Sequence, residues 1–332
     1  MIRRSGKMPA SLSVVMPAYN VEAYIEAALD SLLSQHHLPD EILIIDDGST
    51  DGTPGKLERY KSYDFIQVIR TENQGLGPAR NLGLATSKGD FVYFFDSDDL
   101  LEPDFVTAMK KIIEERSPDI ILFSGESFTE AGYQSDFSPD YRRGFSAVYE
   151  QGVKAIRPLY DSGGLKASAC LYLSRRELWP ESGLSFPAII HEDEAVFLPL
   201  LARAGRTVVD NRVYFRRRVR ADSIMTSVPT QRHVTSAAQL VRALSMEFGN
   251  NVDKSAENAL VWKERIRNQT TRYIRYADQC HERPDLELVL SVYKVTGQPR
   301  LLALALYTSL PLTIRRTLGT LIRKLRSNGA TP

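Results

Sequence analysis

Three carboxylates end an apolar, aromatic-rich run of the sequence. Residues 89–99 read GDFVYFFDSDD, so Asp96, Asp98 and Asp99 follow directly on a stretch of strand character. Like charges this close repel and raise one another's pKa unless a cation or a cluster of donors neutralises them. Oxygen ligands without a nearby His or Cys favour Mg²⁺ or Mn²⁺, ions that commonly share their site with substrate phosphates. The alternative interpretation is a solvated acidic turn that caps the helix expected near Pro103.

The surrounding elements are expected to position these acids at the edge of a sheet. Two earlier apolar runs, SLSVVMPAYN and EILIIDDGSTDGT, also end in polar residues, and FIQVIR is a further short strand. Apolar residues recur at helical spacing over 21–35, more weakly over 52–61, and over 76–86. Strands that alternate with helices predict an α/β fold with a mostly parallel sheet flanked by helices. Ligands bind beyond the carboxyl ends of such strands, where PAYN, DD and DSDD lie.

Common nucleotide-binding folds of the α/β class are not supported. The sequence has no GxxxxGK[ST] loop, and GxGxxG does not follow the first expected strand. Neither a P-loop NTPase nor a dinucleotide-binding unit is therefore indicated.

Four ordered motifs carry a resemblance to a known family. VVMPAYN, IIDDGSTDGT, NQGLGPARNLGL and GDFVYFFDSDD follow one another within residues 14–99. Together they resemble family 2 of the inverting glycosyltransferases, whose fold is called GT-A. The resemblance implies a nucleotide-diphosphate-sugar donor, with UDP as the commonest carrier in the family, and a divalent ion, Mn²⁺ or Mg²⁺, held by a DxD-type motif.

The resemblance also implies roles for residues at the strand ends. Pro17 and Tyr19 would line the nucleoside pocket together with Ala18. Asp47 would accept a hydrogen bond from the base, and Arg80 would approach the base or the phosphates.

The DSDD segment would hold the sugar and the metal. Asp96 would bind the ribose or the sugar, with Ser97 also counted among the nucleotide-binding residues. Asp98 and Asp99 would be the metal ligands, and which of the two is the main ligand stays open. Expulsion of a diphosphate requires that its developing charge be neutralised by a metal or by Arg and Lys.

A second acidic cluster opens an expected helix within FPAIIHEDEAVFLPLLARAG, residues 186–205. Acids in a first helical turn also favour the macrodipole and cap free N–H groups, which is the structural interpretation. The resemblance implies instead that Asp193 is the general base, because the acceptor hydroxyl must lose a proton as it attacks. Glu192 and His191 would orient or tune it, and His191 could instead contact the acceptor or a phosphate.

An arginine-rich segment, YFRRRVRADSIM, occupies residues 214–225. Such a run is often a solvated surface. Its R-x-R-x-x-S-I-M spacing resembles the segment that closes the catalytic domain in many non-processive members. Arg218 and Arg220 are therefore expected to clamp the diphosphate once a flexible loop closes.

Composition limits the classes of protein that remain. The chain has 332 residues and a formal net charge of +1, which gives no basic field for nucleic-acid binding. Cys170 and Cys280 lie far apart and suggest a reducing cytoplasm rather than a disulfide framework. The basic start, MIRRSGKMPA, leads into the first expected strand rather than into a signal-peptide run. A cytoplasmic location is expected.

The C-terminal part reads as a helical appendix. Glu287 is the last acidic residue, and the expected final helix places apolar residues on one face: Leu310, Ile314, Leu318, Leu321 and Leu325. A basic amphipathic helix without acids suits an anionic membrane surface, and its apolar stretches are too short to span one. A helix packed on its own domain, or one that pairs two chains into a homodimer, is the alternative.

These observations predict a catalytic domain over 1–227 and a helical region over 228–332. The nucleotide-sugar half would occupy about 10–124 and the acceptor half about 125–227. The sequence lacks the QxxRW motif and the several spanning helices of processive synthases.

The expected activity is metal-dependent, inverting transfer of one hexosyl or N-acetylhexosaminyl unit. The acceptor would be a glycan or a lipid-linked hydroxyl, in cell-surface polysaccharide biosynthesis, at the inner face of the plasma membrane if the chain binds membrane. A non-catalytic sugar-nucleotide-binding scaffold is one alternative. A nucleotidyltransferase is another, but it would need a Gly-rich basic loop where the sequence has PAYNVEAY.

Overall fold

The computed structural model describes residues 10–130, 139–220, 228–250, 255–311 and 314–315. Contacts divide the chain into two compact units. The first comprises Met1–Ala188 and Glu192–Ser227, and the second comprises Ile189–His191 and Val228–Pro332. The domain boundaries predicted from the sequence, including the division at 124/125, stay a prediction.

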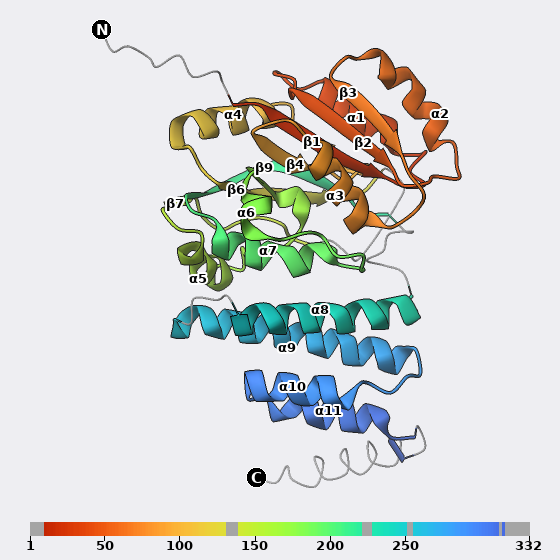
Figure 1. Ribbon diagram of the computed structural model, residues 1–332, viewed down its shortest axis with the longest axis vertical. Helices are drawn as coiled ribbons and strands as arrows, with labels where there is room; N and C mark the ends of the chain where they lie inside the picture. Colours follow the sequence, from red (N-terminus) through yellow and green to blue (C-terminus); the bar gives the residue numbers. More distant parts are fainter. Residues whose placement is uncertain (1–9, 131–138, 221–227, 251–254, 312–313, 316–332) are drawn as a thin grey trace, which may run out of the picture. The chain divides into compact units, whose positions relative to one another are not determined.

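The first unit is built on one sheet (Figure 1). Its described strands are β1 (Leu12–Ala18), β2 (Glu41–Asp46), β3 (Ile66–Arg70), β4 (Phe91–Phe94), β5 (Leu100–Leu101), β6 (Ile120–Phe128), β7 (Ala147–Tyr149), β8 (Tyr172–Arg175) and β9 (Thr207–Arg218). They follow the order β3-β2-β1-β4-β8-β6-β9-β5, and β7 also pairs with β9. The neighbours from β3 to β4 are parallel, β8 is antiparallel to β4 and β6, and β6 is parallel to β9. The predicted α/β class with a mostly parallel sheet is confirmed.

Helices cover the sheet and connect its strands. In the first unit they are α1 (Ile25–Leu33), α2 (Thr53–Leu57), α3 (Leu76–Thr86), α4 (Phe105–Arg116), α5 (Val153–Asp161), α6 (Leu178–Ser182) and α7 (Glu192–Arg203). The helix expected over 52–61 is in fact the short α2 followed by a 3₁₀ turn, Glu58–Ser62. Gly55 inside α2 weakens the helix, which agrees with the weak periodicity of that segment. A turn over 21–24 precedes α1, whose first residue is Ile25.

The core explains why the strands read as continuous apolar runs. Leu12, Val14 and Met16 of β1 pack into one cluster with residues of α1 and α4, while Val15 points to the other face. There α3 crosses so closely that a Cβ on Gly83 would lie 2.2 Å from Val15 Cγ1. A strand buried on both faces needs apolar residues at every position, and only glycine permits this approach of helix to strand.

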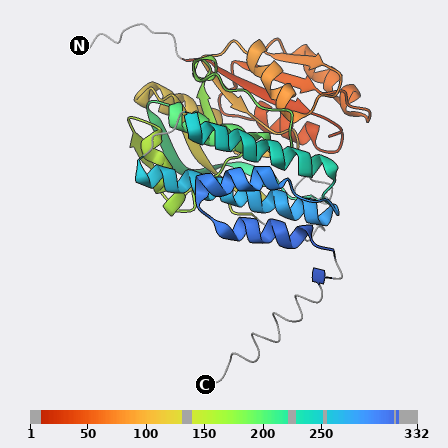
Figure 2. The same cartoon turned by 60° about the horizontal axis from the view of Figure 1, so that its bottom comes forward.

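The second unit is helical in its described part, as the predicted helical appendix requires. It contains α8 (Gln231–Asn250), α9 (Ala256–Gln279), α10 (Leu286–Thr296) and α11 (Pro299–Ser309). Figure 2 shows these helices side by side, and α9 contacts each of the other three. Asp285 caps α10, because its carboxylate accepts from the backbone N–H groups of Glu287 and Leu288. No helix in the described ranges has both the length and the apolar character to cross a membrane.

The final amphipathic helix expected from the sequence falls mostly outside the described residues. Leu310 and Ile314 are described, whereas Leu318, Leu321 and Leu325 are not.

Candidate functional site

Three parallel strands deliver the predicted nucleotide-binding residues to one edge of the sheet. The register pairs Ala18 of β1 with Asp46 of β2, and Val15 of β1 with Phe94 of β4. The segments that follow these strands therefore start side by side. Pro17 and Ala18 are buried in β1, whereas Tyr19 just beyond it is 48% exposed. Exposed aromatic surface at a strand end is available for a flat ligand such as a nucleobase.

Asp47 fixes the loop that leads into α3. Its two carboxylate oxygens accept from the backbone N–H groups of Gln74 and Gly75, at 2.9 and 2.8 Å. Gly75 has φ of 97°, a conformation that favours glycine. Asp47 is also buried, so in this structure its carboxylate orders the loop. Its predicted contact with a base would use lone pairs that these bonds leave free.

Arg80 of α3 lies between two acids that are far apart in the sequence. Its Nη2 donates to Asp96 Oδ1 at 2.7 Å, and its Nη1 donates to Glu192 Oε1. Burial alone would lower the pKa of Arg80, but the charges of Asp96 and Glu192 outweigh it and the pKa is raised. The guanidinium also lies over the ring of Phe186, 5.4 Å from its centroid. Only 2% of the side chain is exposed, and its predicted approach to the base or the phosphates stays a prediction.

The acids of the DSDD turn all have arginine neighbours. Asp98 Oδ2 accepts from Arg220 Nε at 2.9 Å, and Asp99 Oδ1 accepts from the backbone N–H of Arg218 at 2.7 Å. The Arg218 side chain donates to the carbonyl of Asp98 and pairs with Glu130. The end of β9 is thus tied to the turn after β4. Ser97, between the acids, is buried.

The charge of Asp96 is stabilised more strongly than that of Asp99. Burial would raise the pKa of Asp96, but Arg80 and then Arg217 lower it, and its net pKa is below the ordinary value. Burial and the neighbouring charge of Asp98 raise the pKa of Asp99 well above its ordinary range. The negative charge of Asp99 is therefore compensated less by neighbouring arginines than that of Asp96.

One group of described side chains has metal-ligand spacing. Ligand atoms of Asp96, Asp99 and Cys170 all lie within 4.8 Å of one another. The carboxylates suit a hard divalent cation. Cys170 does not suit it, because burial raises the pKa of its thiol well above the ordinary value and a protonated thiol is a poor ligand for Mg²⁺ or Mn²⁺. Asp98, a predicted ligand, is not in this group, and its part in metal binding stays a prediction.

Asp193, in the first turn of α7, has two acids as its sequence neighbours, unlike the DSDD acids with their arginine neighbours. Burial raises its pKa to about 7, and repulsion by Glu192 and Glu194 adds to this, while Arg80 opposes it. Its Oδ1 accepts from the N–H of Glu194 at 2.8 Å, as expected for an acid in a first helical turn. Burial also raises the pKa of Glu192 above its ordinary value, although the charge of Arg80 opposes this shift. A carboxyl group poised near neutral pH is suited to accept and release a proton.

His191 immediately precedes α7 and has φ of 63°, in the left-handed region. It is grouped with the second unit by its contacts. Its predicted role beside Asp193 stays a prediction. Of the R-x-R-x-x-S-I-M segment, Ser223, Ile224 and Met225 lie outside the described residues.

The structure brings three residues to the site that the sequence did not single out. The guanidinium groups of Arg218 and Arg220 lie over the ring of Tyr24, 5.1 and 5.0 Å from its centroid. Arg217 lies over Tyr141, at 5.5 Å, and its charge acts on Asp96 and Asp99. Because side chains alternate along a β-strand, the sequence could have predicted that Arg217 faces the opposite side of the sheet from Arg216 and Arg218. Nothing in the sequence around Tyr24 indicates its role.

The third of these residues, Tyr172, begins β8. Its hydroxyl is buried and has no hydrogen-bond partner among the described residues. Burial raises its pKa, and Asp193 is the neighbouring charge that raises it most. Tyr172 is therefore close enough to sense the charge on Asp193.

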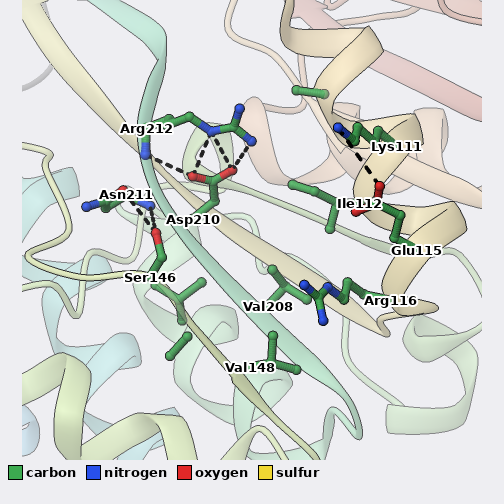
Figure 3. A pocket seen from close by; sticks show the side chains of 13 residues that line it. Lys111, Ile112, Glu115, Arg116, Ser146, Val148, Val208, Asp210, Asn211 and Arg212 are labelled. Carbon is green, nitrogen blue, oxygen red and sulfur yellow. Dashed lines mark hydrogen bonds and ion pairs between the residues drawn. The ribbon is translucent and has the colours of Figure 1, made fainter.

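A surface hollow lies elsewhere on the first unit, between α4, β7 and β9 (Figure 3). Val148 and Val208 line it, and at one end Arg212 pairs with Asp210 at 2.6 Å. None of the predicted site residues lines this hollow.

Comparisons with known proteins agree with this arrangement. Residues 13–158 match the family model described as glycosyl transferase family 2. The glycosyltransferase GlyA of Streptococcus pneumoniae is 35% identical over 161 residues, which cover 48% of this chain and 23% of GlyA. TuaG of Bacillus subtilis, whose name refers to a glycosyltransferase of teichuronic acid biosynthesis, is 40% identical over 108 residues, which cover 32% of this chain and 43% of TuaG. The chain thus spans less than half the length of these curated relatives.

A solved structure shares the fold over most of the chain. The crystal structure of S. aureus TarS 1–349 in complex with UDP-GlcNAc aligns with a TM-score of 0.65 and 21% sequence identity. The alignment covers 89% of this chain and 83% of that one. This likeness establishes the GT-A type of fold. Residues 13–158 are thus similar to glycosyl transferase family 2, while the likeness to TarS concerns the fold alone.

Proposed function

We propose that this protein transfers one sugar from a nucleotide-diphosphate sugar, with UDP as the carrier, to a hydroxyl group of a glycan or lipid-linked acceptor. The transfer inverts the anomeric centre by direct displacement. The donor lies at the strand ends, where Pro17, Ala18 and Tyr19 line the nucleoside pocket and Asp47 meets the base.

The observation that carries this proposal is the environment of Asp193. Burial and two like-charged neighbours raise its pKa to about 7, so near neutral pH a substantial fraction is ionised and able to accept a proton. Asp193 takes the proton of the acceptor hydroxyl as that oxygen attacks the anomeric carbon. The bond from that carbon to the diphosphate oxygen breaks, and the nucleoside diphosphate leaves with the electron pair.

Arg80 is a positioning residue in this scheme. It contacts Asp96, which binds the ribose or sugar, and Glu192, which adjoins the base. Because one buried guanidinium holds both acids, the donor side and the base side of the site keep a fixed spacing. A fixed spacing of reacting groups lowers the entropic cost of reaching the transition state.

A divalent cation, Mn²⁺ or Mg²⁺, would be held by Asp98 and Asp99. When bound, it would neutralise charge that develops on the leaving diphosphate. Arg218 and Arg220 stand beside these acids and would bind phosphate oxygens, which guanidinium groups do in bidentate fashion. His191 and Ser97 would make secondary contacts with the acceptor and the donor.

The comparisons support the class of substrate without fixing it. One structural neighbour is solved with UDP-GlcNAc, and one relative is named for teichuronic acid biosynthesis. We place this chain in cell-surface polysaccharide biosynthesis, on the cytoplasmic side, with an acceptor carried on a lipid or a growing glycan.

Donor hydrolysis tests the proposal. Products released from UDP, GDP and dTDP sugars would be followed by NMR, with and without Mn²⁺, in wild type, Asp98→Ala and Asp193→Asn. Metal-dependent turnover of one donor that both variants lose is the expected result. Asp161→Asn, a surface acid paired with Arg157, is the matched control and should keep full activity.

Two other outcomes would favour the alternative functions, a non-catalytic scaffold or a nucleotidyltransferase. Absence of metal-dependent nucleotide binding by isothermal calorimetry, together with no turnover, would favour a scaffold that does not catalyse. Release of pyrophosphate from a nucleoside triphosphate and a sugar 1-phosphate would favour a nucleotidyltransferase.

A further inference from the structure

A short segment, residues 186–191, leads directly into α7 and is called the entry segment below. The first unit holds its start. Asn81 of α3 donates to the carbonyl of Phe186 at 2.8 Å and accepts from the N–H of Phe186 at 2.9 Å. The Phe186 ring also packs against Phe94 and Trp179, with ring centroids 5.0 Å apart in each pair. The position of Phe186 is therefore fixed by both its backbone and its side chain.

The end of the entry segment belongs to the helical unit. Ile189, Ile190 and His191 group with residues 228–332 by their contacts. The N–H of Ile190 donates to Ser236 Oγ of α8 at 3.0 Å. Ser236 is 5% exposed and Ile189 is 7% exposed, so this bond lies in a region largely shielded from water. A shielded N–H that loses its acceptor is costly, and Ser236 therefore determines where Ile190 lies.

The turn between this hydrogen bond and α7 has an unfavourable backbone conformation. His191 has φ of 63°, in the left-handed region that residues other than glycine rarely adopt. Such a conformation costs free energy and persists only where surrounding contacts hold it. Ser236 bonds to the residue before His191, and Arg80 pairs with Glu192 after it. Asp193 follows at once, so the direction of its carboxylate depends on both contacts.

We propose that Ser236 of α8 is a positioning residue for Asp193. Its hydroxyl group holds the entry segment, and the entry segment sets the first turn of α7, where Asp193 takes the proton of the acceptor. The inference rests on the proposed function and deepens it, because it gives the helical unit a part in the reaction. Ser236 acts through the backbone of residues 190–192 and contacts neither the donor nor the acceptor.

A purely structural role for Ser236 is the alternative. In that role its loss would lower the melting temperature and leave turnover at the assay temperature unchanged. A positioning role has a different signature, because misplacement of a base by about 1 Å can slow the reaction up to about 10²-fold. Donor binding, which does not involve the base, would be kept.

Amide hydrogen exchange of the full chain, followed residue by residue by NMR, tests the anchor without requiring activity. In Ser236→Ala the Ile190 amide loses its acceptor, and its exchange should accelerate about tenfold. The Glu194 amide donates to Asp193 Oδ1, so its exchange should accelerate as well when the first turn of α7 loosens. Unchanged exchange at Ile190 would overturn the proposal, and so would acceleration confined to Ile190.

Kinetics test the effect on the base. With the sugar nucleotide that wild type hydrolyses, Ser236→Ala should lower kcat about tenfold and leave the donor KM within about twofold. Ser245→Ala is the matched control, because the Ser245 hydroxyl donates to the Val241 carbonyl within α8 at 2.7 Å. It removes the same oxygen from the same helix and should keep the kcat and the amide exchange of wild type. Circular dichroism would establish that both variants are folded at the assay temperature.

The two measurements separate this inference from the proposed function. If wild type turns over a donor and Ser236→Ala keeps its kcat, the positioning role is wrong while the proposed transfer reaction stands. An equal fall of kcat in Ser245→Ala would overturn the positioning role in the same way. If wild type turns over no sugar nucleotide, the proposed function fails, and exchange at Ile190 and Glu194 still decides whether Ser236 orders the start of α7.

Discussion

The acids of the DSDD turn and the acids at the start of α7 differ in what surrounds them. Asp96 and Asp98 each accept a hydrogen bond from an arginine side chain, and Asp99 accepts one from the backbone of Arg218. Asp193 instead has two glutamates beside it in the sequence. The pKa of Asp96 is lowered, whereas that of Asp193 is raised to about 7.

This difference shows how one residue type serves two purposes. An aspartate surrounded by arginines stays charged and can bind a cation or a sugar hydroxyl. An aspartate that is partly withdrawn from water beside other acids gains and loses a proton near neutral pH. Arg80 reaches both groups, so its single charge divides between them.

The largest effect is expected from Asp193→Asn. An amide cannot accept the acceptor's proton, so turnover should fall about 10²- to 10⁴-fold while donor binding is kept. In wild type, kcat should fall about tenfold for each pH unit below about 7, because protonated Asp193 is inactive as a base. Steady-state kinetics as a function of pH would check both results. A flat profile across pH 7 would refute the assignment of Asp193 as the base.

Arg80→Met should cause the largest loss of stability. Removal of the guanidinium leaves buried Glu192 and partly buried Asp96 without their common partner, at a cost of about 3–5 kcal/mol in the free energy of unfolding. Urea denaturation would measure it. Arg70→Met is the control, because Arg70 is 57% exposed and lies 3.6 Å from Asp46, and it should cost less than about 1 kcal/mol. Equal losses for the two variants would contradict a special role for Arg80.

Arg220→Gln should affect two measurements in opposite directions. Without nucleotide, Mn²⁺ should bind more tightly, by about fivefold, since Arg220 no longer competes for Asp98. With donor, kcat should fall more than the donor KM rises, because the clamp on the diphosphate acts mainly in the transition state. Electron paramagnetic resonance of free Mn²⁺ and steady-state kinetics would provide the two values.

The control for this variant is Arg216→Gln. Arg216 precedes the clamp on the same strand and lies 3.7 Å from Glu102 and 3.8 Å from Glu126. It should leave Mn²⁺ binding unchanged. Equal kcat with a raised donor KM in Arg220→Gln would argue for ground-state binding only.

Asp193→Asn should also change how stability depends on pH. The folded pKa of Asp193 is raised to about 7 from its ordinary value of 3.8, so the folded chain binds more protons than the unfolded chain between these values. Stability is therefore lost as pH rises through that window. Asn cannot ionise, so the variant should melt a few degrees above wild type at about pH 8 and close to wild type at about pH 4. A difference in melting temperature that does not grow with pH would contradict the raised pKa.

The smallest effect is expected at Tyr24, whose ring carries Arg218 and Arg220. Tyr24→Leu removes the cation–π contacts, worth about 0.5–1 kcal/mol each, and should raise the donor KM about two- to fivefold. Tyr24→Phe keeps the ring and should behave like wild type. If both variants lose affinity equally, the hydroxyl and not the ring is what matters.

Much of the fold follows from local patterns. The buried runs 14–18 of β1, 42–45 of β2 and 91–94 of β4 are apolar, which predicts strands covered on both faces, and the structure has them as parallel neighbours. The helix expected over 76–86 is α3, with the same bounds. The prediction of one helix over 52–61 was wrong in part, because the segment forms the short helix α2 and then a 3₁₀ turn. Short helices are least certain because few residues contribute to their periodicity.

The residues of the candidate site also fall into two groups: those that short motifs predict and those that only the fold brings together. Asp96, Asp98, Asp99 and Asp193 could be named from short motifs, because each motif lies within a few residues of one strand or helix. The pairing of Arg80 with Glu192 joins positions 112 residues apart, and that of Arg220 with Asp98 joins positions 122 apart. No local pattern reports such a pair, and the roles of all these residues stay predictions.

The sequence by itself determined the order of strands and helices, the four motifs and the acid-free charge of the last residues, because each is a property of neighbouring positions. The tertiary structure alone decided which arginine meets which acid, that Tyr24 supports two of those arginines, and that Ser236 bonds to Ile190. It also decided that Asp193 titrates near neutral pH. Burial and through-space charge set these properties, and both depend on residues that the chain brings together only when it folds.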